Sequence, residues 1–92
     1  MQNVVIYTRT WCGYCTRAKE LLARKAVPFT EIEISNSDAL RDEMIERAGG
    51  RRTVPQIFIG EVHVGGCDDL YRLESEGRLD ALLALASTAT TG

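Results

Sequence analysis

The sequence predicts an α/β domain in which helices flank a four-stranded mixed sheet, with elements in the order β-α-β-α-β-β-α and a short C-terminal helix. Two observations support this prediction. In the first half of the chain, apolar runs of strand length alternate with amphipathic stretches of helix length, the pattern of a parallel β-α-β unit with a right-handed crossover. After Pro55, two strand patterns follow each other with only Gly60 and Glu61 between them, which indicates an antiparallel hairpin.

The first half of the chain contains two strand patterns and two helix patterns. Residues 3–8 form an apolar run of strand length, and residues 29–34 alternate with a period of two. Between them, apolar residues recur at helical spacing up to Pro28, which cannot continue a helix. A second helix is expected after Ser35, which with Asp38 resembles a capping box. Its apolar side consists of Leu40, Met44, Ile45 and Ala48, and it ends at Gly49-Gly50.

The second half continues with the hairpin and two helices. Residues 56–59 and 62–64 are the two strands of the hairpin, and Gly65-Gly66 ends the second of them. Asp68-Asp69 then begin a third helix, where carboxylates favour the helix N-terminus, and Gly77 ends it. A last short helix has an apolar side made of Leu79, Leu82, Leu83 and Ala86.

Size and composition indicate one soluble domain without an overall basic charge. The chain has 92 residues, of which 45% are hydrophobic and 26% charged, enough for a single core. We expect this domain to span residues 1–86 and residues 87–92 to form a flexible tail. The net charge of −2 predicts no binding to nucleic acid, and the short apolar runs predict no membrane association. Without a secretion signal, the cytoplasm is the expected location.

Cys12 and Cys15 form a C-x-x-C motif at the predicted junction between the first strand and the first helix. Two thiols at this spacing can form and open a disulfide without a large backbone movement. The helix dipole and the unpaired N–H groups at a helix start favour the thiolate form of the first cysteine, and the thiolate is the form that attacks disulfides. With only three cysteines in the chain, this motif indicates redox chemistry in a reducing compartment.

A structural zinc site is the alternative interpretation of the same motif. It needs two more ligands, and only His63 and Cys67 are available to complete a Cys3His set. We expect His63 to face solvent from its strand. Helical periodicity follows the C-x-x-C at once and the chain has no second C-x-x-C, so the sequence favours redox chemistry and no resident metal.

Two further motifs add backbone groups that can bind a ligand. The first is Thr53-Val54-Pro55, where proline begins a strand because it has no N–H to donate. A cis bond before Pro55 would turn the backbone groups of Val54 outward as an edge for an extended peptide. The second is the segment 65–69, a glycine-rich turn at a helix start whose N–H groups can bind a carboxylate or phosphate. By itself this segment is better explained as a plain link to a helix capped by Asp68 or Asp69.

These motifs, in this order and spacing, resemble the dithiol glutaredoxins of the small bacterial type over about residues 3–85. The resemblance implies a thioredoxin-like fold and a glutathione-dependent thiol-disulfide oxidoreductase that reduces protein disulfides and glutathione mixed disulfides. Thioredoxin is the rival family, since it also has a tryptophan at the position of Trp11. It differs in the Gly-Pro between its cysteines and in an extra N-terminal strand and helix, for which this chain has no room.

The resemblance also implies a role for each matching residue. Cys12 is the nucleophile and Cys15 the resolving thiol. Glutathione, the expected reductant, is held by a groove that contains Arg9, Tyr14, Thr53, Val54, Pro55, Gly66, Cys67 and Asp68. In that groove the N–H groups of Cys67 and Asp68 hold the γ-glutamyl carboxylate. Arg9, with Gln56 or Arg52, takes the glycine carboxylate. The expected partners are glutathione and proteins that carry a disulfide or a glutathione adduct.

Gly13 departs from the family pattern, which usually has proline between the first cysteine and the tyrosine. A small residue there resembles family members that hold a [2Fe-2S] cluster between two subunits, with two glutathiones as additional ligands. The alternative function is therefore a cluster carrier or sensor, in which Cys12 is an iron ligand and the protein is a dimer. Otherwise we expect a monomer. The complete dithiol motif favours the oxidoreductase.

Overall fold

The computed structural model describes residues 3–84, and the tail predicted for residues 87–92 lies outside this range. Its elements follow the predicted order, and residues 79–84 form the beginning of the expected last helix. The bounds are β1 Val4–Thr8, α1 Gly13–Arg24, β2 Thr30–Glu33, α2 Asp38–Arg47, β3 Gln56–Ile59, β4 Val62–Gly65 and α3 Cys67–Ser75.

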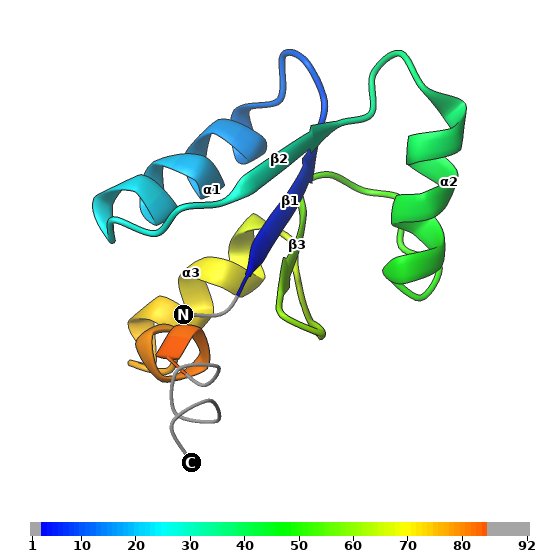
Figure 1. The fold of residues 1–92 in the computed structure, drawn as a ribbon. Helices are drawn as coiled ribbons and strands as arrows, with labels where there is room; N and C mark the ends of the chain where they lie inside the picture. Colours follow the sequence, from blue (N-terminus) through cyan, green and yellow to red (C-terminus); the bar gives the residue numbers. More distant parts are fainter. Residues whose placement is uncertain (1–2, 85–92) are drawn as a thin grey trace.

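The four strands form one mixed sheet in the order β2-β1-β3-β4. β1 pairs in parallel with β2 and antiparallel with β3, and β3 pairs antiparallel with β4. Figure 1 shows that α1 leads from β1 to β2, as the parallel unit requires. The predicted combination of a parallel unit with a hairpin is confirmed.

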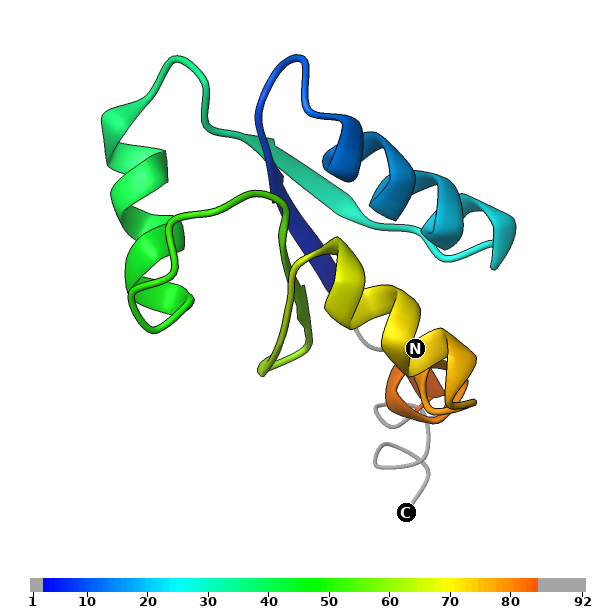
Figure 2. The same ribbon diagram turned by 180° about the vertical axis from the view of Figure 1, so that it is seen from behind.

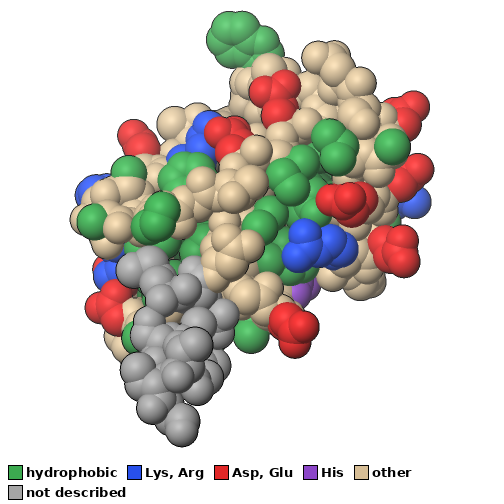
Figure 3. Space-filling model, in the orientation of Figure 1, with side chains coloured by type: hydrophobic (Ala, Val, Ile, Leu, Met, Phe, Trp, Pro, Cys, Tyr) green, Lys and Arg blue, Asp and Glu red, His purple; other side chains and the backbone are tan. Residues whose placement is uncertain are grey.

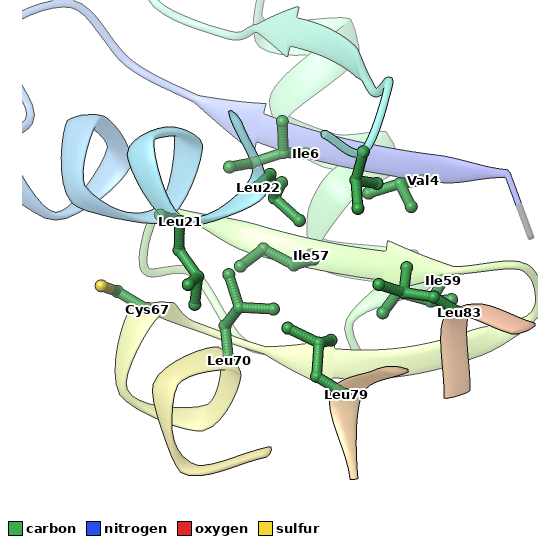
Figure 4. Close-up of a cluster of buried hydrophobic side chains, with 12 residues drawn as sticks. Val4, Ile6, Leu21, Leu22, Ile57, Ile59, Cys67, Leu70, Leu79 and Leu83 are labelled. Atoms are coloured by element: carbon green, nitrogen blue, oxygen red, sulfur yellow. The ribbon is translucent and has the colours of Figure 1, made fainter. Parts of the chain in front are cut away.

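Helices cover both faces of the sheet. α1, α3 and residues 79–84 lie on one face and α2 on the other, as the opposite views in Figures 1 and 2 show. Because side chains alternate along a strand, Ile6 and Tyr7 of β1 enter different cores. Figure 4 shows the larger core, which includes Ile6, Leu22, Ile57, Leu70 and Leu79. The smaller core consists of Tyr7, Ile34, Met44, Ala48 and Phe58.

Local capping sets the ends of α1 and α2. α1 ends at Arg24, before Pro28, because Ala26 takes a left-handed conformation with φ of 56°. The cap of α2 differs from the prediction. Ser37, directly before Asp38, is the N-cap, and its Oγ accepts a hydrogen bond from the Leu40 N–H at 3.1 Å. Ser35 instead accepts from the backbone N–H of Thr10 at 2.8 Å, and so it ties the loop after β1 to the start of α2.

His63 does not face solvent as predicted. The two-residue turn at Gly60 and Glu61 makes Phe58 and His63 direct cross-strand partners, and the register shifts only beyond this pair, between Phe58 and Ile57. The His63 ring is half-buried and stacks on Phe58, with ring centroids 4.9 Å apart and an interplanar angle of 24°. Its Nε2 lies 2.6 Å from Oε1 of Gln56.

The surface carries mixed charge. Figure 3 shows acidic and basic side chains interspersed over the visible face, in keeping with the net charge of −2. No helix within residues 3–84 is long and apolar enough to span a membrane.

Candidate redox site and ligand groove

Cys12 lies at the N-terminus of α1, as the spacing predicted. It is the N-cap residue, and its Sγ accepts a hydrogen bond from the backbone N–H of Cys15 at 3.2 Å. The same sulfur lies 3.9 Å from the carbonyl oxygen of Val54. Cys12 is half-buried, so an approaching disulfide can reach its sulfur. A negative charge on this sulfur would be stabilised by the Cys15 N–H and by the dipole of α1.

Cys15 has a very different environment one turn into the helix. Its side chain is only 2% exposed, and burial, with the neighbouring Cys12 sulfur, raises the pKa of the Cys15 thiol to about 12. The backbone of Arg9 and the ammonium of Lys19 act on this pKa in the opposite direction, with smaller effects. Cys15 is therefore a thiol at neutral pH. The two cysteines are free, and so is Cys67.

The Thr-Val-Pro segment lies beside the Cys12 sulfur. The bond between Val54 and Pro55 is cis, the less common of the two forms that the sequence left open. Pro55 is buried at the start of β3, while Thr53 is exposed. The Thr53 carbonyl and hydroxyl oxygens both accept hydrogen bonds from the side-chain amide of Gln56.

The start of α3 presents backbone N–H groups next to this segment. Gly66 is the N-cap residue, and the Asp69 carboxylate accepts a hydrogen bond from the Gly66 N–H at 2.9 Å. This N–H, with smaller contributions from Arg51 and Arg72, lowers the pKa of Asp69. Asp69 is thus the capping residue, and Asp68 remains exposed with no capping role.

One open groove joins these elements. The chain brings together seven of the eight residues predicted to bind a ligand, and adds three charged ones. Its lining consists of Tyr14, Arg51, Thr53, Val54, Pro55, Gly66, Cys67, Asp68, Asp69 and Arg72. The groove therefore combines two arginines, the N-terminus of α3 and an aromatic ring beside Cys12, a set suited to a small peptide with carboxylates.

The comparison with known proteins decides the family. The family model described as Glutaredoxin matches residues 4–64. A glutaredoxin of Pseudomonas aeruginosa is 60% identical over 84 residues, which cover 91% of this chain and 99% of that protein. The chain belongs to the glutaredoxin family. Glutaredoxins are glutathione-dependent thiol-disulfide oxidoreductases, and this is the activity of the chain, as the sequence predicted.

Solved glutaredoxin structures have the same fold. The solution structure of glutaredoxin from Brucella melitensis is 65% identical, with a TM-score of 0.79 over 90% of this chain and 89% of that one. The crystal structure of a buckwheat glutaredoxin-glutathione complex is 32% identical, with a TM-score of 0.84 over 94% and 80% of the two chains. The predicted thioredoxin-like fold is confirmed.

Arg9 is the one predicted groove residue that the glutaredoxin fold does not bring to the groove. It lines two neighbouring depressions around Cys12, and one of them also contains Tyr14 and Val54, so Arg9 lies next to the groove. The two residues expected to assist Arg9, Gln56 and Arg52, do not line the groove either, and Gln56 is 0% exposed.

Three residues that the sequence did not predict also line the groove, namely Arg51, Asp69 and Arg72. The Arg51-Arg52 pair directly before the Thr-Val-Pro segment was a signal for a cation here, but the sequence could not show which arginine turns inward. Arg51 is placed by its ion pair with Asp69, at 3.4 Å. Arg72 lies one turn along α3 from Asp69.

The zinc alternative is not assembled within the described residues. Among residues 3–84, no group of three or more His, Cys, Asp and Glu side chains is placed to hold a metal ion. His63 is bonded to Gln56, and Cys67 is buried at the start of α3, where burial raises the pKa of its thiol.

Proposed function

We propose that Cys12 is the nucleophile of this glutaredoxin and that Cys15 resolves the mixed disulfide. The observation that carries this assignment is the contrast between the two sulfurs. Cys12 is accessible and accepts the Cys15 N–H at the helix start, whereas Cys15 is buried and stays protonated. Only an accessible thiolate can begin an attack on a substrate disulfide.

With a protein disulfide as substrate, the Cys12 thiolate attacks one sulfur and the other leaves as a thiolate that takes up a proton. Cys15 then loses its proton to solvent and attacks the Cys12 sulfur. This step releases the second substrate sulfur and forms the Cys12–Cys15 disulfide. Two glutathione molecules reduce that disulfide and leave as oxidised glutathione, so each substrate disulfide consumes two thiols of glutathione.

With a glutathionylated protein as substrate, Cys12 takes the glutathione and the protein leaves as a free thiol. A second glutathione then attacks the adduct, releases oxidised glutathione and restores Cys12. This route does not use Cys15. The two reactions therefore differ in their need for the second cysteine.

The groove beside Cys12 is the proposed binding site for glutathione. The N–H groups of Cys67 and Asp68 are available at the start of α3 for the γ-glutamyl carboxylate, and the Asp68 carboxylate suits its ammonium group. Val54 offers its backbone to the peptide. Arg51 and Arg72 add positive charge within the groove for the glycine carboxylate, and Arg9 lies next to it. A glutathione complex of the buckwheat relative supports this proposal.

The test is a glutathione-coupled assay on two variants with both substrate types. Cys12→Ser is expected to lose both reactions. Cys15→Ser is expected to lose reduction of protein disulfides and to keep release of glutathione from a glutathionylated peptide. Wild-type rates in Cys12→Ser would overturn the assignment, as would an equal loss of both reactions in Cys15→Ser.

The cluster-carrier alternative has Gly13 as its specific support. No neighbouring atom lies within 4 Å of where a Cβ at Gly13 would be, so the structure gives no packing reason for glycine there and adds nothing in favour of a cluster. We propose instead that the protein is a monomer and that it acts on protein disulfides and glutathione adducts in the cytoplasm. Anaerobic purification with glutathione checks this, since a coloured dimer with Cys12-dependent visible absorption would contradict it.

A further inference from the structure

A buried glutamine connects β4 with the Thr-Val-Pro segment. Gln56 begins β3 and is 0% exposed. Its Nε2 donates to the Thr53 carbonyl oxygen at 2.9 Å and to the Thr53 Oγ1 at 3.1 Å. Its Oε1 lies 2.6 Å from Nε2 of His63. One amide side chain therefore links a residue of the groove to a histidine outside it.

The direction of each hydrogen bond follows from the Thr53 carbonyl. A carbonyl oxygen can only accept, so the Gln56 atom that faces it must be the amide nitrogen. The amide oxygen then faces His63, and Nε2 of His63 must be the donor. Burial and the Arg51 guanidinium lower the pKa of His63, against a smaller effect of Asp69. A neutral His63 must therefore carry its proton on Nε2.

These hydrogen-bond directions determine whether the Thr53 hydroxyl can donate to a ligand. A hydroxyl has one proton to donate, and the Thr53 oxygen already accepts from Gln56. The Thr53 proton is therefore free for another acceptor. Thr53 is exposed and lines the groove, so its hydroxyl is a donor available to a ligand there.

The His63 ring is held in place. It stacks on its cross-strand partner Phe58, and the guanidinium carbon of Arg47 lies 4.4 Å from the centroid of the Phe58 ring. If the Gln56 amide inverted, its nitrogen would face the His63 N–H and its oxygen would face the Thr53 carbonyl. Both pairs are repulsive and buried polar groups would lose their partners, so the observed orientation is strongly preferred.

We propose that His63 and Gln56 are positioning residues that set the Thr53 hydroxyl as a hydrogen-bond donor to a carboxylate or peptide carbonyl of glutathione. The proposal rests on the assignment of the groove to glutathione. His63 and Gln56 do not line the groove and act only through Thr53.

Binding of S-methylglutathione, which cannot exchange disulfides, tests the proposal on the full chain by NMR titration. His63→Phe keeps an aromatic ring for Phe58 and removes the donor, and we expect its Kd to rise about 3- to 10-fold, the value of one hydrogen bond. His63→Gln restores an N–H donor and is expected to recover most of the affinity. Val62→Thr, at an exposed position of the same strand, is the control with unchanged Kd.

A double-mutant cycle separates positioning from a general structural effect. Thr53→Val keeps the shape of the side chain and removes its hydroxyl, and it should raise the Kd by a similar factor. In that background, His63→Phe should change the Kd by less than about twofold, because the group through which it acts is gone. Factors that multiply would overturn the proposal, as would failure of His63→Gln to recover affinity while its far-UV circular dichroism remains native. If His63→Phe does not fold, His63→Met, which also lacks an N–H donor, takes its place in the cycle.

A groove control distinguishes failure of the positioning proposal from failure of the assignment of the groove to glutathione. If Asp68→Ala weakens binding and Thr53→Val does not, the positioning proposal fails and the glutathione groove stands. If wild type does not bind S-methylglutathione, the groove assignment itself fails.

Discussion

At the scale of single residues, the main contrast is between Cys12 and Cys15. They are three positions apart in the sequence, but the start of α1 makes one an accessible N-cap and the other a buried helix residue. Burial opposes ionisation of Cys15, while the Cys12 sulfur accepts the Cys15 N–H at the helix start. This contrast is the basis for the proposed roles of the two thiols.

We predict that iodoacetamide modifies Cys12 well before Cys15 in the folded, reduced protein near neutral pH. With the pKa of Cys15 at about 12, its thiolate fraction near pH 9 is only about 0.1% and rises about tenfold with each pH unit. Mass spectrometry of peptides after timed labelling measures this order. In concentrated guanidinium chloride all three cysteines should react alike. Labelling of Cys15 at the rate of Cys12 would contradict the assigned environments.

Gly65 has a backbone conformation that a side chain would disturb. Its φ is 115°, and a Cβ there would lie closer than 3.0 Å to the Asp69 carboxylate and the Arg51 guanidinium. We predict that Gly65→Ala lowers the free energy of unfolding by about 1–3 kcal/mol. Gly66→Ala is the matched control, since its nearest contact is at 3.5 Å, and it should cost less than about 1 kcal/mol. Urea unfolding measures both, and equal losses would contradict the prediction.

At the scale of elements, the start of α2 shows that the position of a serine relative to the helix decides whether it caps that helix. Ser35 and Ser37 both precede the helix and both accept a backbone N–H, but only Ser37 bonds within α2. Ser35 instead fixes the loop that carries Thr10 toward Cys12. Each serine therefore stabilises a different segment.

Hydrogen exchange of single amides separates the two roles. Ser37→Ala should increase exchange of the Leu40 amide and cost about 1 kcal/mol of stability. Ser35→Ala should leave the Leu40 amide protected and expose the Thr10 amide instead. Loss of protection at Leu40 in Ser35→Ala would contradict the separate roles of the two serines.

At the scale of the whole molecule, the packing of α1 and α3 on one face of the sheet creates the site. The two helices begin near each other (Figures 1 and 2). Tyr14 of α1 and residues 66–69 at the start of α3 therefore line the same groove. Leu70 of α3 is fully buried in the shared core with Leu21 and Leu22 (Figure 4). The core therefore holds the two halves of the site together.

We predict that Leu70→Ala lowers the free energy of unfolding by about 2–5 kcal/mol, because it leaves a cavity between the helices and the sheet. Leu73→Ala, at a half-buried position of the same helix, should cost clearly less. Thermal unfolding followed by circular dichroism measures the difference. Similar midpoints for the two variants would show that the core at Leu70 can collapse around the smaller side chain.

Much of the fold could be predicted because its signals are local. Hydrophobic periodicity, Pro28, Pro55 and the glycine turns gave the order of the elements. The two cysteines, the Thr-Val-Pro segment and the Gly-Gly-Cys-Asp-Asp segment indicated the chemistry for the same reason. Seven of the predicted ligand residues share one groove because each lies at the end of an element that the fold aligns.

The sequence by itself determined the element order, the redox motif and the family. Only the tertiary structure decided that Arg51 and Arg72 line the groove and that His63 packs on Phe58 beside Gln56. The physical reason is the distance along the chain over which each interaction acts. Periodicity, caps and motif spacing act over a few residues, whereas the burial of a thiol, the register of a hairpin and the approach of an arginine depend on segments that meet only when the sheet and its helices have packed.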